Sequence, residues 1–324
     1  MNKLVITQEI FEKHVSSATN ADNAVFDAIT SELAVAENFI TDKLGLSVFN
    51  SIPERILFFY ERAVCLYAYS IAIPHLDLVL TPTGFGVVST SNVVPASSDR
   101  VHRLLAAVCS AYDDAIDEII ALLRYEKEWN DTDKAVELFS SFFWSGKQLR
   151  RCGKPNAHRS DFHDYLPAID IYEAELREVI GDEIIDELLI AIRHAECSSE
   201  QRVLVRMIEQ YIAASLGEAL YYELRTLKNS IIRYLLNNLT KFPTFENSSA
   251  YRAIKTEHYE NQKDRLKILR HATLLEQVFV HPVIPHRHSS CSAPQSSCGI
   301  AGSSPVPPRP SVRRIAAQCF HAAF

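Results

Sequence analysis

The chain has 324 residues, of which 47% are hydrophobic, so it is long enough to bury a substantial core in one large or two smaller domains. Its net charge at pH 7 is −7, and the segment from Gln277 onward contains four Arg but no Asp or Glu, which leaves −11 on residues 1–276. Such an acidic body disfavours broad binding to a nucleic-acid backbone, which requires clustered Lys and Arg.

The cysteines and the N-terminus indicate a soluble protein in a reducing compartment. Cys65 and Cys109 lie within apolar helical patterns, where a thiol packs like a small hydrophobic group. Residues 1–15 lack the apolar core of a signal peptide. The most apolar run, residues 63–73, is shorter than the roughly 20 residues that span a bilayer. We therefore expect a cytoplasmic protein without membrane contact.

Helical patterns dominate the first part of the chain. Thr7 is placed to cap a short helix, and Asp22 or Asn23 to cap a long one. The long helix should end near Gly45, a typical stop signal, and its apolar residues recur at helical spacing: Ile29, Leu33, Ala36, Ile40 and Leu44. Pro53 opens a helix that is apolar on nearly every face, which predicts a central, buried position.

Residues 76–95, LDLVLTPTGFGVVSTSNVVP, depart from this helical pattern. Two β-prone runs flank turn residues at 81–84, which predicts a β-hairpin arm that protrudes from the helical body. An edge strand leaves backbone groups unpaired, and this arm carries more apolar surface than a free loop should expose. It supplies the candidate partner-binding residues: Leu78, Val79, Leu80, Thr83, Phe85, Val87 and Val88. The alternative, that the arm folds back on its own helices, stays open.

The next helix, capped by Ser97 or Ser98 and with apolar residues recurring up to Leu123, is strongly amphipathic and has an acidic side. Its acidic residues are Asp113, Asp114, Asp117 and Glu118. Such a side is usually solvated, but it also suits docking to a basic partner, and both interpretations stay open. Acid–base catalysis would require one carboxyl group in an apolar pocket, and no sequence pattern indicates one.

A shorter helix is expected at residues 134–143, and a polar, basic segment with Gly and Pro follows, which we interpret as a linker. In the second half, one long helix is expected at residues 199–239. The tail holds seven of the 14 Pro and should be disordered, either as a native tail or as the product of a frameshift near Asp264. The predicted division is an N-terminal helical unit with the arm (1–145), a linker (146–160), a C-terminal helical unit (161–278) and the tail (279–324).

The two helical units share a local pattern. In the first, the helix that ends at Gly45 leads into the more apolar helix at Pro53. In the second, a helix that ends at Gly181 leads into a helix around Arg202, and its apolar residues have similar spacing: Tyr165, Ile169, Tyr172, Leu176, Val179 and Ile180. This similarity predicts two duplicated helical hairpins, at residues 22–73 and 164–220.

No motif in the sequence indicates an enzyme. The TGFG run at residues 83–86 lacks the Gly-Lys-Ser/Thr of a phosphate-binding loop and the third Gly of a dinucleotide loop, which favours a structural turn. G-x-S-x-G, H-E-x-x-H and C-x-x-C motifs are absent. The possible metal ligands have spacings that match no common site, and the aspartates among them also suit helix capping: His158, Asp161, His163, Asp164, His281, His286, His288, Cys291 and Cys298. We expect no enzymatic activity, cofactor or metal.

The runs TPTGFGVV at residues 81–88 and PAS at residues 95–97 resemble an uncharacterised protein family of Bacteroidales phages and prophages. The segments VITQEIFEKHV, at residues 5–15, and AENFITDKLG, at residues 36–45, are similar as well. The second of these also resembles the helical head–tail connector proteins of tailed phages, which form rings between portal and tail. The resemblance covers about residues 1–260 and implies a virion structural role, without catalytic residues to carry over.

Together these patterns predict an all-α helical bundle with a duplicated helical-hairpin unit and one small β-hairpin arm. The resemblance implies a head–tail connector or neck protein that assembles into a homo-oligomeric ring, contacts phage portal or tail proteins, and occurs in the bacterial cytoplasm and the virion. The alternative is a non-enzymatic helical binding or regulatory module of a mobile element. We expect neither membrane contact nor sequence-specific binding to nucleic acid.

Overall fold

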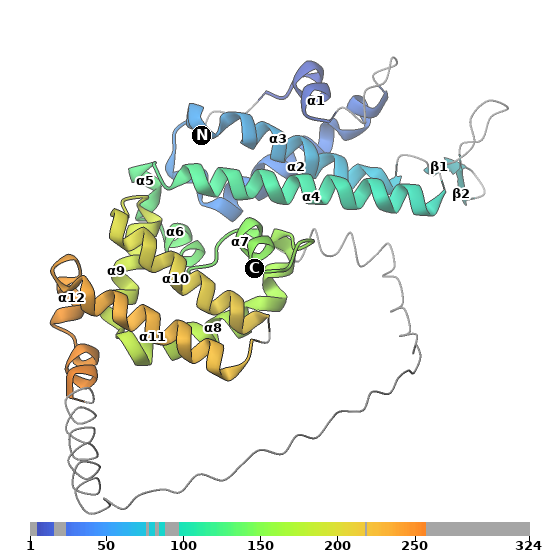
Figure 1. The fold of residues 1–324 in the computed structure, drawn as a ribbon. Coiled ribbons are helices and arrows are strands. Elements are labelled where there is room, and N and C mark those ends of the chain that lie inside the picture. Colours follow the sequence, from blue (N-terminus) through green and yellow to red (C-terminus); the bar gives the residue numbers. More distant parts are fainter. Residues whose placement is uncertain are drawn as a thin grey trace, which may run out of the picture.

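The computed structural model describes residues 5–15, 24–75, 78–81, 84–87, 97–217 and 219–256 (Figure 1). The fold is all-α, which confirms the predicted fold class. The helices before residue 124 form one group and the helices after residue 161 form another, with short helices between them (Figure 1). The predicted tail, residues 279–324, lies outside the described residues.

The central helix of the N-terminal group is α3 (Glu54–Ala72). It packs against α1 (Gln8–His14), α2 (Ala24–Leu44) and α4 (Ser98–Leu123). Because three helices surround α3, it is buried on several sides, through Ile56, Tyr60, Ala63, Val64, Cys65, Leu66, Tyr67, Ala68 and Tyr69. The apolar pattern after Pro53 therefore predicts the position of this helix correctly.

Local sequence signals set the ends of these helices. The Thr7 hydroxyl accepts a hydrogen bond from the Ile10 amide at 3.3 Å and caps α1. Gly45 ends α2 in a left-handed conformation with φ of 65°, and a 3-10 turn, η2 (Leu46–Val48), follows. Nε1 of Trp129 donates to the Leu44 carbonyl at 2.7 Å, which ties the end of α2 to α5 (Lys127–Asn130).

Two short strands, β1 (Leu78–Thr81) and β2 (Gly84–Val87), form an antiparallel pair in the segment where the sequence predicts the arm. Their register pairs Leu78 with Val87 and Leu80 with Phe85. Figure 1 places them beyond the ends of α3 and α4, on the side away from the last helices. The strand side chains and the rest of the arm, including Thr83 and Val88, lie outside the described residues. The partner-binding role of the arm therefore stays a prediction.

The segment predicted as a linker, residues 146–160, has structure of its own. The helix before this segment, α6 (Asp133–Leu138), is shorter than predicted. The segment itself contains α7 (Gly146–Arg151) and the start of η4 (Arg159–Asp161). Ser145 and Gln148 form a capping box, and the side chain of Gln148 is buried. The polar composition suggests a solvated linker, but Lys147, Arg150 and Arg159 form ion pairs with carboxylates of α4 instead.

The C-terminal group consists of α8 (Phe162–Ile180), α9 (Asp182–Arg193), α10 (Ser199–Leu216), α11 (Tyr221–Asn237), η5 (Leu239–Lys241), α12 (Pro243–Glu246) and a last helical stretch at residues 249–256. The prediction of one long helix at residues 199–239 is wrong. The chain leaves the helix at Gly217, and α11 packs against α10. Gly is a poor helix former, so a helix end at this residue has a clear physical cause.

The predicted duplication is wrong in its helix order. After Gly45 a 3-10 turn leads to α3, whereas after Gly181 helix α9 begins at once and precedes α10. The φ and ψ angles also differ, at 65° and 33° for Gly45 but 93° and 149° for Gly181. Residues 22–73 and 164–220 are therefore not equivalent hairpins. The inserted α9 is strongly amphipathic and buries Ile184, Ile185, Leu188, Leu189 and Ile192.

Gly45→Ala should destabilise the fold by about 2 kcal/mol or more, because the residue would adopt a left-handed conformation and its Cβ would lie 2.9 Å from the Lys134 Cβ. Gly153→Ala is the matched control, since Gly153 also has a positive φ, of 83°, but its Cβ would meet no atom within 4 Å. Urea denaturation of both variants measures the difference. Equal losses of stability would contradict the close packing of Gly45 against α6.

Candidate functional site

The acidic side of α4 contacts the segment from α7 to η4. We call this contact the polar junction, and it consists of Asp113, Asp114, Asp117, Glu118, Lys147, Arg150, Arg159 and Ser160. Asp113 and Asp117 lie one helical turn apart on the same side of α4 and are only 6% and 2% exposed. Asp113 and Asp117 are therefore not part of a solvated surface. They dock against a basic segment, and that segment belongs to the same chain.

Asp117 and Arg159 form the centre of the polar junction. The Arg159 guanidinium donates to Asp117 Oδ1 at 2.9 Å and to the Trp144 carbonyl at 2.7 Å. The Gly146 backbone also lies close to this carboxylate, since a Cβ on Gly146 would be 3.3 Å from Asp117 Oδ2. Burial raises the pKa of Asp117 above its ordinary value, although the Arg159 charge opposes this shift. A Cβ on Gly146 would lie 3.0 Å from the Arg159 amide nitrogen, so the segment approaches itself too closely for a larger residue.

The other carboxylates of α4 extend the contact on both sides. Asp113 Oδ2 accepts a hydrogen bond from the Ser160 amide at 3.1 Å, and burial raises the pKa of Asp113. Arg150 donates to Asp114 at 2.9 Å, and Lys147 pairs with Glu118. The Asp114 and Glu118 side chains are 48% and 36% exposed, so these outer pairs are worth less than the buried one.

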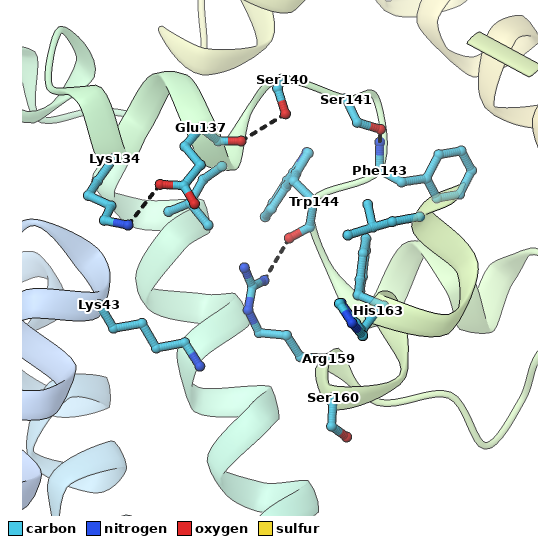
Figure 2. Close-up of a pocket in the computed structure, with 13 residues that line it drawn as sticks. Lys43, Lys134, Glu137, Ser140, Ser141, Phe143, Trp144, Arg159, Ser160 and His163 are labelled. Carbon is cyan, nitrogen blue, oxygen red and sulfur yellow. Dashed lines mark hydrogen bonds and ion pairs between the residues drawn. The ribbon is translucent and has the colours of Figure 1, made fainter. Parts of the chain in front are cut away.

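A pocket of about 250 Å³ adjoins the polar junction (Figure 2). Lys43 enters it from α2, Lys134 and Glu137 from α6, and Arg159 from η4, as Figure 2 shows. Aromatic and hydroxyl side chains complete the walls: Ser140, Ser141, Phe143, Trp144, Ser160 and Phe162. The pocket is slightly smaller than typical small-molecule sites, which have volumes of about 300–1,000 Å³.

Among the cations of this pocket, Lys43 has the pKa that differs most from its ordinary value. Burial lowers the pKa of its amine from 10.5 to about 8, and repulsion from Arg159 adds to this shift, while the Asp113 carboxylate opposes it. The ammonium also lies over the rings of Phe39 and Tyr112, at 5.6 and 5.9 Å from their centroids. Near neutral pH, Lys43 therefore exchanges protons more readily than an ordinary lysine.

Two polar side chains fix the loop that forms one wall of the pocket. Glu173 of α8 accepts hydrogen bonds from the Ser141 hydroxyl at 2.6 Å and the Phe142 amide at 2.9 Å. Gln148 accepts from the Trp144 amide at 2.8 Å and donates to the Phe142 carbonyl at 2.7 Å. Burial raises the pKa of Glu173. The wall is thus attached to both α7 and α8.

The charges around this pocket balance each other. Lys134 pairs with Glu137 at 2.8 Å, and Arg159 pairs with Asp117. The Asp113 carboxylate attracts the Lys43 ammonium electrostatically. The buried carboxylates are engaged by donors, so they are poorly placed for acid–base chemistry on a ligand. The arrangement suits binding of a small polar group through hydroxyls and the Lys43 amine.

His158, Asp161 and His163, three of the residues considered as metal ligands, have other contacts in the structure. His158 Nδ1 lies 3.2 Å from the Ser110 hydroxyl, and Asp161 accepts from the His158 amide at 2.6 Å. His163 lines the pocket instead, and in the described part of the chain no group of three or more His, Cys, Asp or Glu is placed to hold a metal. The candidates in the tail lie outside the described residues: His281, His286, His288, Cys291 and Cys298.

Sequence reasoning missed the main cations of the site. Lys43 follows an ordinary helical pattern near the end of α2, and nothing in that pattern marks it as buried. Arg159 belongs to the segment interpreted as a linker. The one available signal was charge complementarity between an acidic helix and the basic segment that follows it.

Residues 12–137 match a protein family that is described as a family of unknown function (DUF6712). The match covers Lys43 and the acidic side of α4, but it stops before Arg159 and the basic half of the polar junction. No curated protein and no solved structure matches the chain. Among the described helices, none is both long and apolar enough to cross a membrane.

Arg159→Gln should destabilise the protein by about 3–5 kcal/mol, because it leaves Asp117 buried without its charged partner. Adding Asp117→Asn should recover part of this loss, and a double-mutant cycle from urea denaturation measures the coupling. The control cycle is Lys134→Gln with Glu137→Gln, an exposed pair that should couple by less than about 1 kcal/mol. A coupling no larger than in the control would contradict a central role for this contact.

Lys43 should make the unfolding free energy depend on pH in the alkaline range. The folded chain releases the Lys43 proton near pH 8, whereas the unfolded chain keeps it up to about pH 10.5. The unfolded state therefore binds more protons between these values, so the wild type should gain stability relative to Lys43→Met as pH rises from 8 to 10.5. Urea denaturation of both proteins at several pH values measures this, and parallel curves would argue against the lowered pKa.

Proposed function

We propose that this protein is a virion structural component of the phage type, a head–tail connector or neck protein that acts by assembling into a ring. The observation that carries the proposal is the ribbon of β1 and β2. Two strands form the whole sheet within the described residues, so each has an outer edge without a neighbouring strand there. Such edges are suited to pairing with a strand or groove of an adjacent subunit.

The position of the ribbon and its sequence support this role. The ribbon lies beyond the ends of α3 and α4 (Figure 1), where a neighbouring subunit could reach it without disturbing the helices. The register pairs apolar residue types, Leu78 with Val87 and Leu80 with Phe85. A short two-stranded ribbon is only marginally stable alone, so a partner that covers it would also stabilise it.

The polar junction adds a second supporting argument. The contact of α4 with α7 and η4 attaches the N-terminal helical group, through buried charges, to the segment that leads into α8. Such a contact would suit a ring subunit that transmits forces between neighbours without hinging. The resemblance to connector proteins and the balanced charges around the first pocket favour assembly over catalysis. Under this proposal the partners are further copies of the chain and the portal or tail proteins, in the bacterial cytoplasm and the virion.

The alternative is a non-enzymatic binding or regulatory module of a mobile element. The pocket beside Lys43 favours it, because the pocket combines hydroxyls, aromatic rings and an amine with a pKa of about 8. A module of this kind would act as a monomer or small oligomer and respond to a small polar ligand. Oligomeric state separates the two functions.

Phe85→Asp with Val87→Asp should abolish ring formation and leave the helical circular dichroism unchanged, because the charges would be placed on the ribbon that contacts the neighbour. The control is Val136→Asp with Ile190→Asp, two residues that are 46% and 50% exposed on helices outside the arm. Mass photometry and negative-stain microscopy of the pure proteins, alone and mixed with the portal protein of the same genome, measure assembly.

We expect rings for the wild type and the control variant and monomers for the arm variant. A wild type that remains a monomer alone and with the portal would contradict the connector function and favour the binding module. Rings that persist in the arm variant would contradict the assigned role of the ribbon.

A further inference from the structure

A second pocket, of about 400 Å³, lies between the end of α4, helix α7 and helices α9 and α10. We call it the arginine pocket, because Arg124, Arg151, Arg202 and Arg206 line it. Glu209 is its one acidic lining residue. Phe142, Trp144 and Val205 provide an apolar part of the wall. None of these residues belongs to the arm on which the proposed assembly rests.

Arg124 is fixed in place at the inner side of this pocket. Its Nε donates to the Ile192 carbonyl at 2.5 Å. Its guanidinium lies against two neighbouring aromatic rings, at 5.7 Å from the Phe139 centroid and 5.4 Å from the Trp144 centroid. Burial lowers the pKa of Arg124, yet a guanidinium stays charged at any ordinary pH. A fixed cation of this kind needs little reorganisation to bind an anion.

The charge of the arginine pocket is not balanced, in contrast to that of the first pocket. Within the described residues, no carboxylate forms an ion pair with any of its four arginines. Glu209 accepts a hydrogen bond from Gln148 at 2.8 Å, and the nearby Cys197 has its pKa raised by burial. Arg202 uses Nε to bind the Cys197 carbonyl at 3.1 Å. Four positive charges therefore face one negative charge in a protein whose net charge is −7.

The backbone beside this pocket is also unusual. Ala195, which lines the pocket, has φ of 54°, the only positive φ at a non-glycine residue in the described chain. It is the left-handed residue that ends α9, where the Glu196 amide donates to the Ala191 carbonyl at 3.0 Å. The carbonyls of Ile192 and Cys197, on the two sides of this turn, accept hydrogen bonds from Arg124 and Arg202 and orient them.

From this cluster we propose that the arginine pocket binds the oxyanion group of a small ligand, a phosphate or a carboxylate. Guanidinium groups donate paired hydrogen bonds to the oxygens of both. The volume is within the range of small-molecule sites, and the aromatic wall can cover an apolar or planar part of the ligand. The inference does not depend on ring assembly.

Isothermal titration calorimetry of the full chain at low ionic strength tests this, with pyrophosphate and citrate as separate probes. We expect saturable one-to-one binding of at least one probe. Arg202→Gln with Arg206→Gln should weaken binding at least about tenfold, because two charge-assisted contacts are lost. The control is Arg225→Gln with Arg233→Gln, two exposed arginines of α11 outside the pocket, and it should change affinity less than about twofold.

Binding of pyrophosphate alone would identify phosphate as the group recognised, and binding of citrate alone would identify carboxylate. Arg151→Gln on α7 provides a second pocket variant if the double variant does not fold, which circular dichroism detects. The absence of saturable binding for both probes, or equal weakening in the α11 control, would overturn the proposal.

Discussion

The buried contact between Asp117 and Arg159 is the interaction on which the rest of the structure depends. The two side chains are 2% and 12% exposed, so neither charge has much water to replace its partner. The same guanidinium binds the Trp144 carbonyl, and the same carboxylate lies close to the Gly146 backbone. One ion pair thus fixes α4, the start of α7 and η4 in a single arrangement, and both pockets include residues of these elements.

This constraint explains how a mainly acidic chain forms its two pockets. Pairing of Arg159 with Asp117, and of Arg150 with Asp114, uses the basic residues of the former linker to neutralise α4. Arg151 of the same helix α7 has no such partner among the described residues and faces the arginine pocket instead. The first pocket is left balanced and the second carries excess positive charge, which is why the proposed anion site is the second pocket.

The sequence predicted the all-α class, the central position of α3 and the stop at Gly45, because each depends on local periodicity or on a single glycine. It did not predict α9 or the break at Gly217, because the apolar spacing on the two sides of each is similar, and periodicity alone does not distinguish one long helix or hairpin from two helices. The site was harder still. Burial of Lys43 and pairing of Arg159 with Asp117 arise from contacts between residues far apart in the chain, and helical periodicity carries no information on them.

Residues 146–160 are docked to α4 and are not a free linker. Hydrogen–deuterium exchange with mass spectrometry on the full chain tests this docking most directly, since the Ser160 amide donates to Asp113 and the Cys152 amide to the Gln148 carbonyl. A docked segment should exchange about 100-fold or more slowly than an unstructured peptide, which corresponds to an opening free energy of about 3 kcal/mol or more. Exchange of this segment at the rate of an unstructured peptide would contradict the account.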